Sequence, residues 1–111
     1  MNDLKSLHCQ PLEGQPPMTS AEIAAHLVHA TGWTQRDAAI EKSWRFGNFH
    51  ETMAFVNAVA WIAHAEDHHP DIALGYDRCT LRFNTHSVGG LSINDFICAA
   101  KVDALLATPA P

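Results

Sequence analysis

Residues 49–70, FHETMAFVNAVAWIAHAEDHHP, decide the architecture of this chain. Apolar side chains recur at helical spacing through most of this stretch, and they cover a large part of the helix circumference. A helix of this kind is usually buried from two sides, here by a sheet and by a neighbouring subunit or helix. Asn48 is a good N-cap and Pro70 cannot continue a helix, so the helix should run to about Asp67.

Strands are predicted on both sides of this helix. The best signal lies at residues 79–84, where apolar and polar side chains alternate with a period of two, and residues 43–46 alternate in the same way. Residues 33–39 and 72–76 are the expected partner segments of two hairpins. Because the links within each pair are short, the strands should pair antiparallel.

Two further helices are marked at their first turns. Thr19 with Glu22, and Ser92 with Asp95, have the spacing of a capping box, and each pair precedes apolar residues at helical spacing. The element order predicts an α+β fold, an antiparallel sheet of about four strands with three helices packed on one face.

The domain organisation follows from the same pattern. Residues 1–18 contain three prolines and a glycine without sustained periodicity, and they are predicted to form a mobile N-terminal arm. Residues 19–108 are predicted to form a single domain, with a frayed tail after it.

Composition excludes several classes of function. Seven Lys and Arg against twelve Asp and Glu give the 111-residue chain a net charge of −5, which argues against a nucleic-acid binder. No apolar run reaches the ~20 residues of a membrane span, and no basic segment followed by an apolar core marks a signal peptide. We therefore expect a cytoplasmic protein. Its three cysteines, with no CxxC spacing, are expected to be reduced thiols.

The long helix also predicts self-association. Its second apolar face, around Phe55, Val59 and Ile62, is expected to contact another copy of the chain. The prediction is a homodimer or homotetramer formed through the Asn48–Asp67 helix.

Three of the eight histidines are candidates for catalysis by proton transfer. His68 and His69 leave the long helix, and His86 follows the best strand just before a glycine pair. Imidazole has an unperturbed pKa of ~6.5 and is the usual group that transfers protons near neutral pH. If these three element ends meet, the histidines line one cleft. Each could equally be a capping or surface residue.

A metal site is the second possibility. His64 and His68 stand four residues apart, which is a spacing of zinc ligands on a helix. An HExxH motif has Glu directly after the first histidine, whereas this chain has Ala65 there, followed by Glu66 and Asp67, so no metal is expected.

Several motifs together resemble the pterin-4a-carbinolamine dehydratase family. They are residues 63–70 ending in Asp-His-His-Pro, Asn84-Thr85-His86, and Gly90-Leu91-Ser92 with Asp95. Gly32-Trp33 and residues 40–49 are similar to the family's aromatic strand and the start of its long helix. The resemblance covers about residues 19–108. One departure is His64, where the family often has Glu, so the role of that acid is not carried over to nearby Glu66.

The resemblance implies a 4a-hydroxytetrahydrobiopterin dehydratase that needs no cofactor. Its members convert 4a-hydroxytetrahydropterin to quinonoid dihydropterin and water. By resemblance, His68 and His86 are the general acid and base in an order left open, and His69 chiefly binds the pterin. The remaining substrate-binding positions would be Pro70, Thr85, Ser87, Val88 and Asp95.

Two other functions remain open from the sequence. Animal relatives are also dimerisation cofactors and transcriptional coactivators that bind a partner's helix through the long-helix surface. A third possibility is a family member without dehydratase activity that serves other pterin metabolism.

Overall fold

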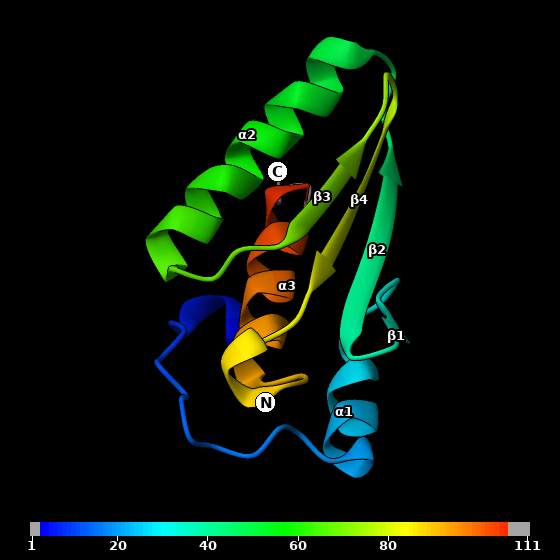
Figure 1. The fold of residues 1–111 in the computed structure, drawn as a ribbon. Coiled ribbons are helices and arrows are strands. Elements are labelled where there is room, and N and C mark those ends of the chain that lie inside the picture. Colours follow the sequence, from blue (N-terminus) through cyan, green and yellow to red (C-terminus); the bar gives the residue numbers. More distant parts are fainter. Residues whose placement is uncertain (1–2, 107–111) are drawn as a thin grey trace.

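Four antiparallel strands form one sheet in the order β1-β2-β4-β3 (Figure 1). The computed structural model describes residues 3–106. In chain order the elements are η1 (Leu4–Ser6), α1 (Ser20–Leu27), β1 (Thr34–Arg36), β2 (Ala39–Arg45), α2 (Phe49–Glu66), β3 (Asp71–Leu74), β4 (Arg78–Phe83), η2 (His86–Val88) and α3 (Ile93–Leu105). Both hairpins and the α+β class are as predicted; the two short 3₁₀ helices, η1 and η2, were not predicted.

The helices α2 and α3 lie side by side against one face of the sheet, and α1 lies near the start of β2 (Figure 1). The ring of His26 in α1 stacks on Phe96 in α3, with centroids 5.1 Å apart, so α1 joins the same layer. The opposite face is polar, as the Ser43–Thr80 and Glu41–Arg82 side-chain contacts show. A sheet with one covered face explains the alternation in the sequence.

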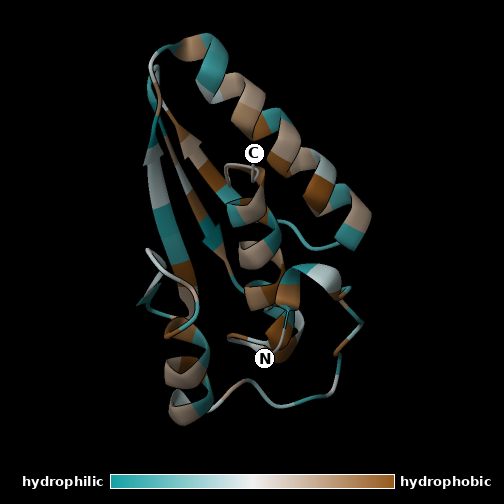
Figure 2. Cartoon of the chain, turned by 180° about the vertical axis from the view of Figure 1, so that it is seen from behind, coloured by the Kyte–Doolittle hydropathy of each residue, from teal (hydrophilic) through white to brown (hydrophobic). Residues whose placement is uncertain are grey.

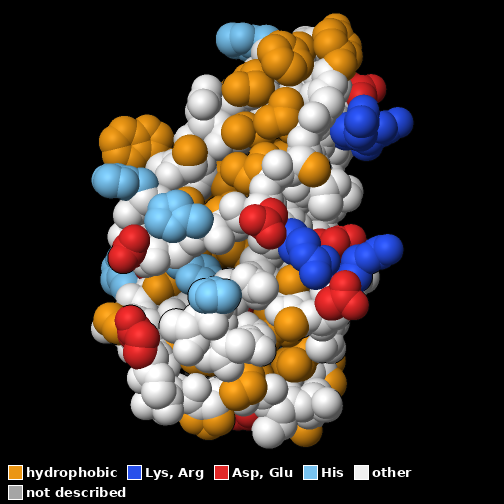
Figure 3. All heavy atoms as spheres, in the orientation of Figure 1, with side chains coloured by type: hydrophobic (Ala, Val, Ile, Leu, Met, Phe, Trp, Pro, Cys, Tyr) orange, Lys and Arg blue, Asp and Glu red, His pale blue; other side chains and the backbone are white. Residues whose placement is uncertain are grey.

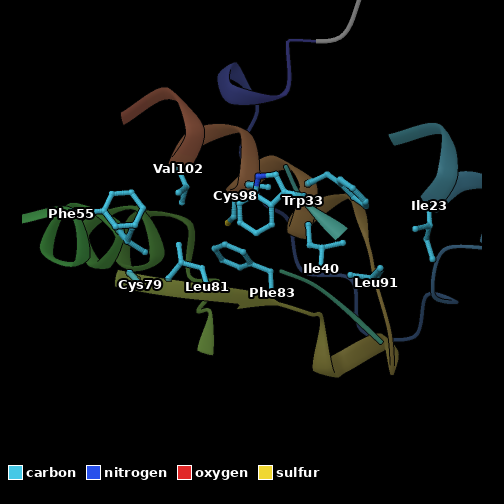
Figure 4. Close-up of a cluster of buried hydrophobic side chains, with 13 residues drawn as sticks. Ile23, Trp33, Ile40, Phe55, Cys79, Leu81, Phe83, Leu91, Cys98 and Val102 are labelled. Carbon is cyan, nitrogen blue, oxygen red and sulfur yellow. The ribbon is translucent and has the colours of Figure 1, made fainter. Parts of the chain in front are cut away.

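Register places the alternating apolar residues of the two central strands opposite one another. Ile40 pairs with Phe83, and Trp44 pairs with Cys79, on the face that the helices cover. Figure 2 shows hydrophobic and hydrophilic residues alternating along these strands. Figure 4 shows the resulting core, in which side chains from the sheet meet those of α2 and α3.

The buried face of α2 corrects the sequence prediction. Phe55 and Val59, assigned to a face that meets another copy, are buried in the core of their own chain, and Ile62 packs at its edge. Phe49 and Trp61 are exposed instead, Trp61 by 74%. The sequence could not assign these residues correctly because nearly every side of this helix carries apolar residues. No helix within residues 3–106 is both long and apolar enough to cross a bilayer.

The helix starts are those predicted. Thr19 with Glu22 and Ser92 with Asp95 form complete capping boxes, and Asn48 caps α2 through the Glu51 amide. At the other end of α2, Asp67 adopts a left-handed conformation with φ 50° and turns the chain toward His68. This turn and the cap of α3 determine where the candidate site forms.

Residues 3–18, in the segment predicted as an arm, run from η1 beside α3, past the end of α2, to α1 (Figure 1). Cys9 and Gln10 bond to side chains of α2 and α3, and Met18 bonds to the carbonyl of Leu91. The domain boundary at residue 19 stays a prediction, and the predicted tail at 108–111 lies outside the described residues.

Candidate functional site

His68 lies at the exit of α2 with its ring held in one orientation. Its backbone amide still bonds to the carbonyl of Ala63, so the helix end positions it. The ring stacks on Phe83 of β4, with centroids 6.0 Å apart and planes 8° from parallel. On its edge, Nε2 lies 2.6 Å from Oδ1 of Asp95.

The carboxylate of Asp95 is fully buried and connects three segments of the chain. Oδ1 faces His68, whereas Oδ2 accepts hydrogen bonds from the hydroxyl of Thr85, at 2.8 Å, and from the amide of Ser92, at 2.9 Å. The hydroxyls of Thr85 and Ser92 are also 2.6 Å apart. A buried polar group needs partners, and within residues 3–106 no buried side-chain nitrogen or oxygen lacks one.

This arrangement selects the tautomer of His68. A carboxylate only accepts hydrogen bonds, so Nε2 carries the hydrogen that faces Asp95. The other ring nitrogen, Nδ1, is then the basic one in the neutral ring. Asp95, the acidic partner in the capping box of α3, therefore also orients His68 to exchange a proton through Nδ1.

A cavity of about 240 Å³ adjoins this histidine. His68, Thr85 and Ser87 contribute to its wall, as does Asn94 in the first turn of α3. Residues 9–13 of the N-terminal segment also line the cavity. The cavity is concave and several polar groups converge on it, as in small-molecule sites, but it is smaller than the ~300–1,000 Å³ of a typical site and its lining is more polar.

The other predicted site residues lie on the two loops around this cavity. His69 and His86 are exposed, and within residues 3–106 their rings have no hydrogen-bond partner. Pro70 directly precedes β3, and Val88 ends η2, the short helix that begins at His86. Figure 3 shows histidine side chains gathered on the face between the end of α2 and η2. The structure thus places His68, Thr85 and Ser87 in the wall of one cavity. The exposed rings of His69 and His86 lie on the adjoining loops, without hydrogen-bond partners within residues 3–106.

The alternative of a metal bound by His64 and His68 loses its geometric basis. Because α2 ends at Glu66, the two histidines do not share one helix face, and the ring of His64 packs against Trp61. Within the described part of the chain, no three His, Cys, Asp or Glu side chains converge as metal ligands would.

Sequence reasoning assigned no role to Glu66, whose side chain is only 4% exposed. Oε1 accepts the amide hydrogen of Cys9 at 2.7 Å, and Oε2 lies 2.9 Å from His8 and 3.5 Å from Lys101. Burial raises the pKa of this carboxyl, but the Cys9 amide, His8 and Lys101 outweigh it and hold the pKa below its ordinary value. No spacing in the sequence indicates contacts between residues so far apart.

A sequence profile of the family "Pterin 4 alpha carbinolamine dehydratase" matches residues 16–105. The chain belongs to this family. A relative from Nitrosospira multiformis, whose name assigns it to the same family, is 51% identical over 106 residues, which span 95% of this chain and 94% of the relative. One from Chromobacterium violaceum, named likewise, is 48% identical over 107 residues, which span 96% and 99%.

A solved structure supports the same assignment. The crystal structure of a transcriptional coactivator/pterin dehydratase from Brucella melitensis superposes with a TM-score of 0.79 at 30% identity, covering 82% of this chain and 99% of that one. The resemblance inferred from the histidine motifs is therefore confirmed at the level of the family.

Proposed function

We propose that this pterin carbinolamine dehydratase family member removes water from 4a-hydroxytetrahydropterin and so takes part in the recycling of tetrahydropterin in the cytoplasm. Family membership supports the reaction, and one geometric observation supports the location of the site: the ring of His68, fixed by Asp95, borders a concave, polar cavity. The product would be quinonoid dihydropterin.

The reaction is a proton-transfer problem. Breaking the C4a–O bond requires a proton on the leaving hydroxyl, and forming the quinonoid product requires loss of a proton from a ring nitrogen. No oxidation state changes overall, so one acid and one base are enough. Each positioned acid or base typically contributes ~10²–10⁴-fold to the rate.

We assign these proton transfers to His68 and His86, in an order left open. His68 would act through Nδ1, because its Nε2 is engaged by Asp95. His86 has an exposed ring at the start of η2, next to cavity-lining Thr85 and Ser87. His69, exposed at the opposite loop, would bind and orient the pterin, with Pro70 and Val88 close to the ring.

The wild-type protein tests this function directly. The carbinolamine should lose its absorbance faster with enzyme than without it, and equally fast in the presence of a chelator, because the mechanism uses imidazoles alone. A rate no faster than the uncatalysed one would contradict the proposal. Activity abolished by the chelator would replace the histidine mechanism with a metal-dependent one.

A role as a dimerisation cofactor or transcriptional coactivator is not favoured. It would use the exposed apolar side of α2, which includes Phe49 and Trp61. That surface fits a second copy of the chain equally well. We therefore propose that α2 mediates a homodimer or homotetramer, together with exposed Ile72, Leu74 and Tyr76 near the sheet edge.

A further inference from the structure

The N-terminal segment from His8 to Met18, here named the strap, crosses the cavity beside His68. Its first part is fixed to both helices that build the site. The Cys9 amide donates to Glu66 at 2.7 Å, and Asn94 exchanges two hydrogen bonds with the backbone of Gln10, at 3.2 and 2.8 Å.

The far end of the strap is fixed to the segment between η2 and α3. The amide of Met18 donates to the carbonyl of Leu91 at 2.8 Å, and Pro17 packs closely against Gly90. Between the two ends, the amide of Gln15 bonds back to Leu12, and Gly14 takes a φ of +85° that suits glycine. The strap is therefore a loop held at both ends, with residues 9–13 turned to the cavity.

The anchors of the strap are themselves buried. Glu66 is 8% exposed and Asn94 is 5% exposed. If the strap left, Glu66 and Asn94 would lose three hydrogen bonds to its backbone, each typically worth ~0.5–1.5 kcal/mol. We therefore treat the strap as a stably bound part of the folded chain.

The same anchors relate the strap to the histidine. Asn94 directly precedes Asp95, which bonds to His68, and Glu66 stands two residues before His68. Through Glu66 and Asn94, the position of the strap is fixed relative to the His68 ring, which lines the same cavity. A wall with this fixed position can contact a ligand that lies on His68.

We propose that residues 9–13 are part of the pterin-binding site, and that Glu66 and Asn94 are positioning residues that hold this wall. Leu12, half-buried, would cover the apolar face of the bicyclic ring. Glu13 would accept hydrogen bonds from the amino and N–H groups of the pterin. This inference rests on the proposed dehydratase function.

The test removes the two side chains of the strap that are proposed to contact the pterin and leaves the histidines unchanged. The double variant Leu12→Ala/Glu13→Ala should raise KM by about tenfold and leave kcat close to that of the wild type, because the wall acts in binding. Gln15→Ala is the matched control, since Gln15 lies in the same turn but does not line the cavity. It should leave both constants unchanged.

A second variant and a second readout keep the test independent of folding defects. Asn94→Ala should raise KM in the same way, whereas a merely structural role would lower thermal stability without changing KM. Equilibrium dialysis with 7,8-dihydropterin should show the matching loss of affinity in both variants. An active wild type with unchanged KM and affinity in the double variant would overturn the strap as a binding wall. An inactive wild type that still binds dihydropterin would overturn only the proposed reaction.

Discussion

The variant Asp95→Asn should lower the rate of proton transfer strongly while leaving the protein folded. Oδ2 accepts from Thr85 and Ser92, so the amide oxygen of Asn should keep that position and its NH₂ group should replace Oδ1, 2.6 Å from His68 Nε2. A donor at that point forces His68 into the opposite tautomer, with the hydrogen on Nδ1. We expect kcat to fall by about 10²-fold or more, because one positioned acid or base is lost.

The same change should also reduce stability. The hydrogen bond to His68 changes from a charged one to a neutral one, so we expect the free energy of unfolding to fall by about 1 kcal/mol. Steady-state dehydration kinetics and urea denaturation measure the two effects separately.

Asp103→Asn is the matched control for this variant. Asp103, also on α3, accepts hydrogen bonds from Trp33 at 3.0 Å and from Lys42 at 2.9 Å, far along the helix from the histidine. It should lose stability but keep the wild-type kcat. A folded Asp95→Asn protein with wild-type kcat would refute the reasoning, as would equal losses of kcat in both variants.

Four further predictions follow from particular groups. His86→Ala should mainly lower kcat and His69→Ala should mainly raise KM in steady-state kinetics, and the reverse pattern would refute the assignment. Because the pKa of Glu66 is held below 4.5, the unfolded state binds more protons; stability measured with urea should fall as pH drops below that value, and Glu66→Gln should weaken this dependence. The Cys98 thiol lies 3.6 Å from the Cys9 sulfur, and a hydrogen bond donated to that sulfur, together with burial, raises the pKa of Cys98; alkylation at about pH 8, followed by mass spectrometry, should therefore modify it only after unfolding. Trp61→Glu should reduce the particle mass found by light scattering, whereas a wild-type monomer would contradict the proposed interface.

The elements and their order could be predicted because local chemistry determines them. Alternation at Cys79, Leu81 and Phe83 reflects a sheet with one covered face, and the capping residues Thr19 and Ser92 mark helix starts through contacts within one turn. The buried face of α2 could not be predicted, because a helix with apolar residues on nearly every side fits the core in more than one rotation.

The site could be predicted only in part. The histidine motifs and Asp95 indicated a family and a shared cleft, and the structure brings His68, Thr85 and Asp95 into one hydrogen-bonded group. The roles of Glu66 and Asn94 could not be found, because their partners lie 57 and 84 residues away in the N-terminal segment. Such pairings depend on tertiary structure and leave no periodic signal.

The turnover number of His68→Ala tests the central claim most directly, namely that a fixed imidazole beside the cavity transfers a proton during dehydration. With saturating carbinolamine, kcat should fall by about 10²-fold or more, while His50→Ala, an exposed histidine in the first turn of α2, should keep the wild-type value. A folded His68→Ala protein that turns over at the wild-type rate would contradict the account.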